Sequence, residues 1–172
     1  MSKIALKKEL LTLDRDQLVA VILDAYTARK EFKEYFEYFL NPDPEKLLDK
    51  FKIITAKELD RTKRGSYSRA RISFLRKQIK AFDSFQPEAE WSLRLRLFIV
   101  AYAMVCEMRQ YFPATLSEGI ASIMTATIDF ADANQLFAST LADIEKMLDN
   151  PDAGTEHFRN FLKTRLMDHI AH

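Results

Sequence analysis

Apolar residues recur every three or four positions along most of the chain, which is the spacing of one face of an α-helix. The segment 14–40 shows this period, and Asp14 with Gln17 three residues later is the pattern of a capping box at its start. A short helix precedes this segment, and the polar residues 27–30 mark a kink or a break within it. The pattern therefore predicts helical structure from the first residues to position 40.

Prolines divide the chain at residues 41–44, which read Asn-Pro-Asp-Pro. Two prolines cannot both lie in a helix interior, and an aspartate followed by proline is a favourable helix start. A helix is predicted from this point to about Arg64 and Gly65. Ser66 or Ser68 is then expected to cap the next helix, which ends near Phe82.

The segment 88–110 is the most apolar of the predicted helices, and residues 97–106 are apolar on more than one side. It is predicted to be a central helix that is buried on nearly all sides. Further helices are expected over 116–148, with an interruption at 132–134, and over 155–170. No run of strictly alternating polar and apolar residues is long enough to predict a strand.

These elements define an all-α fold of seven or eight helices, arranged as an irregular bundle or an array of helical hairpins around the helix at about 88–110. With 172 residues, the chain is expected to form one domain, 1–172. Three glycines argue against glycine-rich phosphate loops and dinucleotide-binding folds. These counts leave a helical protein without the common nucleotide-binding motifs.

Several features bear on location. The first eleven residues carry charges and lead into no apolar core, so they do not resemble a signal peptide. The longest uncharged apolar run, 97–106, is half of the ~20 residues that a transmembrane helix needs. One cysteine, Cys106, excludes an intramolecular disulfide and suits a reducing compartment. The sequence therefore predicts a cytoplasmic protein with no membrane contact.

Residues with catalytic or metal-binding potential are few. His169 and His172 lie close to Asp168, but all three belong to the last five residues, and His157 is remote from them in sequence. Cys106 lies in the most apolar segment without a neighbouring base, which indicates a buried, inert thiol. The sequence therefore predicts no catalytic residue, no cofactor and no metal site.

The net charge of +1 conceals two opposed segments. Residues 57–80 hold nine basic and two acidic side chains, net +7, and residues 107–156 hold nine acidic and two basic ones, net −7. Helical spacing places Arg69, Arg76 and Lys80 on one stripe of the basic segment. This stripe has three interpretations: it faces water or pairs with the chain's own acidic segment, it binds a protein partner, or it follows the phosphates of a nucleic acid.

A family resemblance rests on three stretches of the sequence. They are the residues from Lys3 to Leu13, the following Asp16-Gln17-Leu18, and the aromatic segment 32–39 with Leu40-Asn41-Pro42 after it. Over these residues and into the basic segment after Pro44, which is about the first half of the chain, the sequence resembles an uncharacterised family of small bacterial all-helical proteins. The resemblance implies a domain of unknown function with an all-α fold and a bacterial, cytoplasmic origin. It implies no site.

We expect from these observations a non-catalytic protein-interaction or scaffold module that binds a protein partner or forms a homo-oligomer. Nucleic-acid binding through the segment 57–80, with Arg69, Arg76 and Lys80 as contact residues, is the first alternative. An enzyme with a helical active site that the sequence does not reveal is the second.

Overall fold

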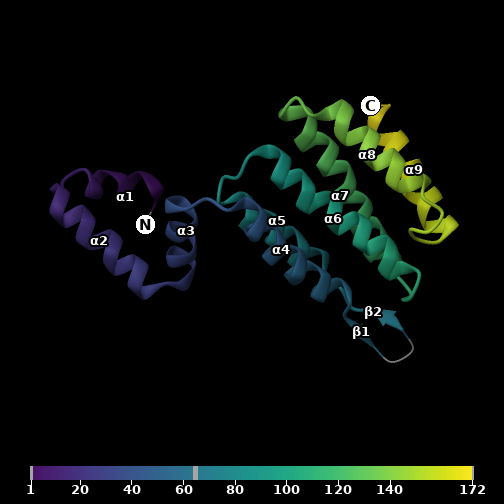
Figure 1. The fold of residues 1–172 in the computed structure, drawn as a ribbon, viewed down its shortest axis with the longest axis horizontal. Helices are drawn as coiled ribbons and strands as arrows, with labels where there is room; N and C mark the ends of the chain where they lie inside the picture. Colours follow the sequence, from purple (N-terminus) through teal and green to yellow (C-terminus); the bar gives the residue numbers. More distant parts are fainter. Residues whose placement is uncertain (1, 64–65, 172) are drawn as a thin grey trace. The chain divides into compact units, whose positions relative to one another are not determined.

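A computed structural model describes residues 2–63 and 66–171, and nine α-helices make up most of this part of the chain (Figure 1). The contacts within the chain divide it into two compact units, Met1–Asp43 and Pro44–His172. Each unit is described by itself below. This division does not test whether the units fold together, so the single domain expected from the sequence stays a prediction.

The first unit consists of α1 (Lys3–Leu10), α2 (Arg15–Ala28) and α3 (Lys30–Leu40). The predicted capping box begins α2: the Gln17 amide donates to Asp14 Oδ1 at 2.8 Å, and the Asp14 amide donates to Gln17 Oε1 at 3.0 Å. These two bonds satisfy amide groups that the first helical turn leaves without a partner. The sequence prediction of this helix start is confirmed.

The helix count differs from the seven or eight predicted. Arg29 adopts an extended conformation with φ −135° and ψ 122°, so α2 and α3 are separate helices. Gln135 has a φ of +62° in the connection that follows Ala133, which prevents one continuous helix through this point. Both breaks fall in polar stretches that the periodicity marked, and together they bring the count in the described residues to nine.

The second unit packs six helices together: α4 (Pro44–Leu59), α5 (Ile72–Asp83), α6 (Ala89–Glu107), α7 (Ala114–Ala133), α8 (Phe137–Asp149) and α9 (Glu156–Ile170). Helix α6 contacts each of the other five, and it contributes fully buried residues such as Leu95, Ile99 and Met104 to the core (Figure 1). The predicted central helix at 88–110 is therefore confirmed. Within the described residues, no helix is both long and apolar enough to cross a membrane.

The segment between α4 and α5 contradicts the sequence prediction. Helix α4 ends at Leu59, and two short antiparallel strands follow, β1 (Thr62–Lys63) and β2 (Tyr67–Ser68). Arg64 and Gly65, where the helix was expected to end, lie outside the described residues. Neither Ser66 nor Ser68 caps a helix, because α5 begins only at Ile72 with Arg71 at the capping position. Strands of two residues are too short to produce a detectable alternation.

Candidate functional site

The three basic residues singled out in the sequence are all exposed, but they do not share one helix. Arg69 precedes α5 and continues from β2, so the predicted helical stripe that included it is wrong. Arg76 and Lys80 lie on α5, and Arg76 Nη2 donates to Ser122 Oγ on α7 at 2.9 Å. Within the described part of the chain, none of the three pairs with an acid of the segment 107–156. Their role as contact residues stays a prediction.

Two arginines of the basic segment converge on its own buried acid. Glu58, at the end of α4, accepts hydrogen bonds from the Arg71 amide at 2.9 Å, from Arg71 Nε at 2.8 Å and from Arg61 Nη1 at 2.9 Å. Burial raises the pKa of Glu58, but the hydrogen bonds from Arg71 and Arg61 together outweigh burial, so this pKa lies below the usual 4.5. Glu58 thereby anchors both ends of the hairpin to α4.

Replacement of this anchor tests its contribution to stability. We expect Glu58→Gln to lower the free energy of unfolding at neutral pH by about 1.5 kcal/mol, because hydrogen bonds to a charged group are lost. Since the folded pKa of Glu58 is depressed, its contribution is complete above pH 4.5 and disappears as the pH falls through the lower folded value. Urea unfolding at a series of pH values measures both effects.

Glu145→Gln on α8 is the matched control, because Glu145 is exposed. The control is expected to leave the stability and its pH profile close to those of the wild type. A Glu58→Gln profile that runs parallel to the wild type down to acidic pH would contradict the assigned role of this carboxylate.

The acidic segment finds its partners on α9 rather than in the basic segment. Within the described residues, two ion pairs join it to α9, Arg165 with Glu118 and Lys163 with Asp149 at 2.6 Å, and His169 Nε2 lies 2.7 Å from Asp129 Oδ1. Over the described residues of both segments, one ion pair links them, and it joins Arg109 of the acidic segment to Asp60 of the basic one, at 3.8 Å. The excess charges that the structure describes thus do not neutralise each other by direct pairing.

Cys106 is buried in α6 beside the carboxylate of Asp60, with 3.6 Å between Sγ and Oδ1. Burial, and after it the charge of Asp60, raises the pKa of the Cys106 thiol to about 11. The same carboxylate accepts a hydrogen bond from the Tyr102 hydroxyl at 3.0 Å. Because the thiol stays protonated at neutral pH, the arrangement does not activate it as a nucleophile.

The histidines take separate positions. His169 contacts Asp129, His157 is exposed and lines a cavity described below, and His172 lies outside the described residues. Over residues 2–63 and 66–171, no group of three or more histidine, cysteine or carboxylate side chains has the arrangement of a metal site.

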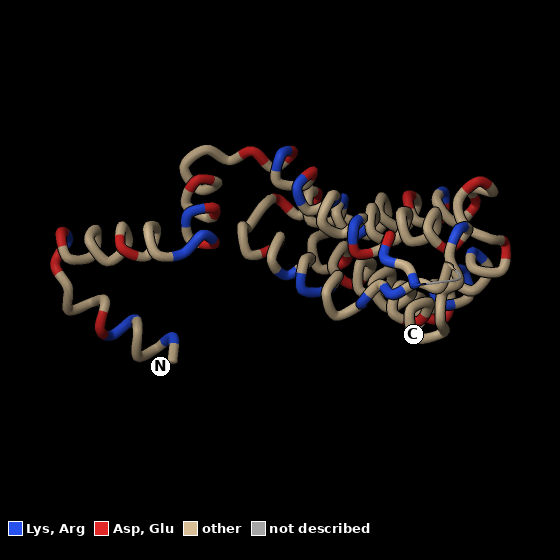
Figure 2. The backbone as a smooth tube through the Cα atoms, turned by 90° about the horizontal axis from the view of Figure 1, so that it is seen from below, with Lys and Arg blue, Asp and Glu red and all other residues tan. Residues whose placement is uncertain are grey.

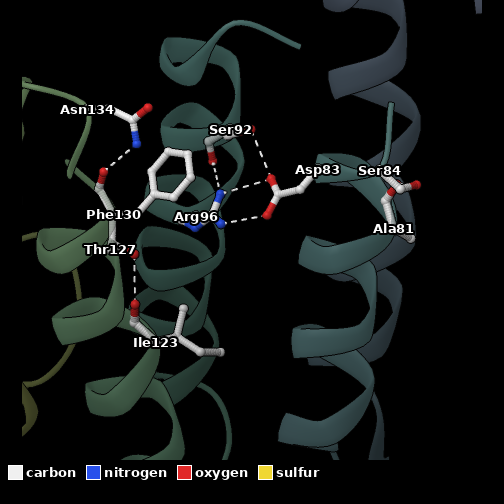
Figure 3. A network of polar contacts seen from close by, with 9 residues as sticks. All are labelled: Ala81, Asp83, Ser84, Ser92, Arg96, Ile123, Thr127, Phe130 and Asn134. Carbon is white, nitrogen blue, oxygen red and sulfur yellow. Dashed lines mark hydrogen bonds and ion pairs between the residues drawn. The ribbon is translucent and has the colours of Figure 1, made fainter. Parts of the chain in front are cut away.

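Sequence reasoning missed an ion pair between α5 and α6 whose buried arginine also lies against a ring of α7 (Figure 3). Arg96 of α6 places Nη2 at 2.7 Å from Asp83 Oδ2 of α5, and its guanidinium lies 4.0 Å from the ring centre of Phe130 on α7. The Ser92 hydroxyl donates to Asp83 Oδ1 at 2.9 Å. These groups contact one another between neighbouring helices, so the network stabilises the packing of the helices. The signal in the sequence is an arginine on the apolar stripe of α6, four positions before the buried Val100.

The N-terminal unit has an unusual surface. The structure describes α1, α2 and α3 in full, and none of their residues is buried. Ten large apolar side chains of this unit are nevertheless exposed: Ile4, Leu6, Leu11, Val19, Val21, Ile22, Leu23, Phe32, Phe39 and Leu40. We call these ten the N-terminal apolar surface. A monomeric protein rarely exposes so many apolar side chains in so short a segment, so this surface is a candidate interaction site.

A second candidate lies where the hairpin meets the turn after α6. A cavity of about 670 Å³ opens there, and its lining comes from the hairpin, the end of α6, the start of α7 and α9. Its residues include Arg109, Gln110, Tyr111, His157 and Phe158. Figure 2 shows the Lys and Arg positions along the described backbone in blue and the Asp and Glu positions in red.

The fold and these two candidate sites define an all-α protein. Its sequence matches the family described as "Family of unknown function (DUF6155)" over residues 1–150, so the chain belongs to this family. The match reaches well beyond the first half of the chain and includes the whole N-terminal unit and α4 to α8. Searches of curated proteins and of solved structures found no match.

Proposed function

We propose that this chain is a non-catalytic protein-interaction module that associates with a second copy of itself through the N-terminal apolar surface. The observation that supports the proposal is the exposure of ten large apolar side chains, nine on α1, α2 and α3 and one, Leu11, directly after α1, in a unit whose helices bury none of their own residues. Each leucine- or phenylalanine-sized side chain gains about 1.5–3 kcal/mol when it leaves water. Burial of the N-terminal apolar surface would therefore be strongly favourable in free energy.

The helices of the unit do not supply that cover themselves. Residues 19–23 of α2 contain four of the ten side chains in five consecutive positions, so they spread around the helix instead of forming one stripe. A segment of about 40 residues is also near the size below which a chain rarely builds a core of its own. Two copies would supply the six helices from which a shared core can form.

Charge supports a second copy as the occupant. Residues 1–43 carry seven basic and eight acidic side chains, a net charge of −1. Two such units approach each other without strong repulsion. A strongly charged surface would instead favour a partner of opposite sign.

The test is the oligomeric state of the full chain. We expect sedimentation velocity to show a concentration-dependent dimer, and Leu23→Glu to weaken it at least about tenfold, because a carboxylate on the buried side of the interface loses its hydration. Leu23 is 58% exposed. Ile53→Glu on α4 is the matched control, since Ile53 is 56% exposed and lies outside the N-terminal unit.

Two outcomes contradict the proposal. A wild-type chain that stays monomeric up to high micromolar concentration would exclude a second copy as the partner. Equal weakening by Leu23→Glu and Ile53→Glu would place the contact elsewhere. Circular dichroism of each variant establishes whether its helix content is retained.

The expected bacterial origin and cytoplasmic location belong to the same proposal. The buried thiol of Cys106 supports the cytoplasmic location alone, because a protonated, enclosed cysteine without a disulfide partner is compatible with a reducing compartment.

A further inference from the structure

Two exposed tyrosine rings lie against each other beside the hairpin. The ring centroids of Tyr67 and Tyr111 are 4.9 Å apart, and the side chains are 45% and 61% exposed. Main-chain hydrogen bonds hold them there: the Tyr111 amide donates to the Ser66 carbonyl at 2.8 Å, and the Ser68 amide donates to the Tyr111 carbonyl at 3.0 Å. The result is an aromatic surface in a fixed position that faces solvent.

Basic side chains share the face of the hairpin that carries Tyr67. Lys63 is directly opposite Tyr67 in the antiparallel pair, so the two side chains project to the same side. Arg69 follows two residues after Tyr67, and its amide donates to the Arg61 carbonyl, which extends the ladder by one step. Lys63 and Arg69 are exposed, and within the described residues neither takes part in an ion pair.

Tyr111 also lines the 670 Å³ cavity, so the aromatic pair joins this cavity to the basic face of the hairpin. The neighbouring Gln110 lines the same cavity and is only 9% exposed. Its Oε1 atom is buried and has no hydrogen-bond partner in the described part of the chain. Buried polar atoms are nearly always paired, so a group left without a partner beside a cavity is a reason to look for a ligand.

The acids of the cavity already have partners. Glu107 accepts hydrogen bonds from the Thr155 amide at 2.9 Å and from the Thr155 hydroxyl at 3.0 Å, and Glu118 pairs with Arg165. Ser66, Arg109, Ser117 and His157 also line the cavity, but among the described residues the Gln110 carboxamide oxygen is the polar side-chain atom that is both buried and unpaired. A carboxamide offers an acceptor and two donors side by side, which matches the hydrogen-bonding edge of a nucleobase.

We propose that this site binds a nucleotide unit, with the base in the cavity against Tyr111, the base edge at Gln110, and the phosphate on Lys63 and Arg69. Aromatic side chains bind bases by stacking, and basic side chains beside them bind the backbone, which is the combination that single-stranded nucleic-acid sites use. A free nucleotide and a nucleotide within a single strand present the same chemistry. The site does not depend on self-association through the N-terminal unit.

Fluorescence anisotropy of the full chain at low salt distinguishes the sources. The probes are labelled single-stranded RNA and DNA of one length, a duplex of that length, and unlabelled mononucleotides as competitors. We expect the single strands to bind more tightly than the duplex, whose bases are stacked and paired, and binding to weaken with added salt. Competition by mononucleotides as strong as that by the single strand assigns the site to a free nucleotide.

Variants locate the site. Tyr111→Ala is expected to weaken binding about tenfold through lost stacking, and Tyr111→Phe to retain it. Gln110→Leu keeps the size of the side chain and removes its amide, so it should weaken binding without loss of fold. Lys63→Ala and Arg69→Ala should each reduce the salt dependence of the binding affinity for the single strands. Lys146→Ala, at an exposed position on α8, is the matched control.

Three results would overturn the site. The first is the absence of binding to strands and mononucleotides alike at low salt. The second is competition by polyglutamate as strong as that by the single strand, which would show a general attraction to anions. The third is full binding by Tyr111→Ala together with losses in Arg76→Ala and Lys80→Ala, which would move the contact to α5.

Discussion

Arg96→Met is expected to lower the free energy of unfolding by about 2 kcal/mol, because it removes the buried partner of an ion pair whose carboxylate is partly exposed, together with its charged hydrogen bonds. The Arg96 side chain is 10% exposed and that of Asp83 is 31% exposed, so Asp83 keeps some contact with water when its partner is lost. Methionine retains the apolar stem of the side chain beside Phe130 but not the guanidinium (Figure 3). Chemical denaturation at neutral pH measures the change.

The neighbouring Arg94 provides the control. Arg94 is exposed, and its guanidinium lies over the Trp91 ring at 4.5 Å, so Arg94→Met is expected to change stability by less than about 1 kcal/mol. The double variant Asp83→Ala/Arg96→Met should lose less free energy of unfolding than the two single variants lose together, since each single change leaves the other charge without its partner. Additive losses would show that the two groups do not interact energetically.

Gly119→Ala is expected to destabilise the chain by about 2 kcal/mol, against the usual preference of helices for alanine. Gly119 lies in α7 next to the start of α5. A Cβ atom added there would be 2.2 Å from Cγ1 and 3.1 Å from Cβ of Ile72, at the first residue of α5. Rotation of the Ile72 side chain would move Cγ1 and Cδ1, but Cβ would stay at 3.1 Å, so the two helices would also have to shift apart by a few tenths of an ångström.

Removal of the opposing atoms tests this explanation. Ile72→Ala eliminates Cγ1 and Cδ1, the two atoms nearest to the added Cβ. The double variant Gly119→Ala/Ile72→Ala should therefore be less destabilised than the sum of its single variants, as thermal unfolding can measure. If Gly119→Ala instead raised the melting temperature, helix propensity would outweigh the steric overlap, and the two helices would have room to separate.

The helix starts and the buried helix could be predicted because their signals are local. Asp14 and Gln17 lie one helical turn apart, and both bonds of the capping box form between them. Pro44 begins α4 as the proline rule requires. The all-round apolar character of 97–106 predicts burial whatever its neighbours are, and α6 is indeed the helix that all others in its unit contact.

The hairpin and its aromatic pair could not be predicted in the same way. Tyr67 pairs with Tyr111, which lies beyond α5 and α6 in the sequence, and the bonds that place it involve main-chain groups that every residue carries. Periodicity assigned Arg69 to the helix of Arg76 and Lys80, because three- and four-residue spacing continues by chance through the hairpin. The spacing of residues along the sequence does not indicate where the chain turns back on itself.

By itself, the sequence determined the all-α class, most of the helix positions and the buried helix at the centre of the second unit. Each of these follows from interactions within a few residues, which spacing and composition report directly. Only the tertiary structure decided which charges meet: Glu58 with Arg71, Arg96 with Asp83, and the acids of 107–156 with α9. Ion pairs between helices depend on the angle and order of packing, and side-chain spacing along one helix contains no information about either.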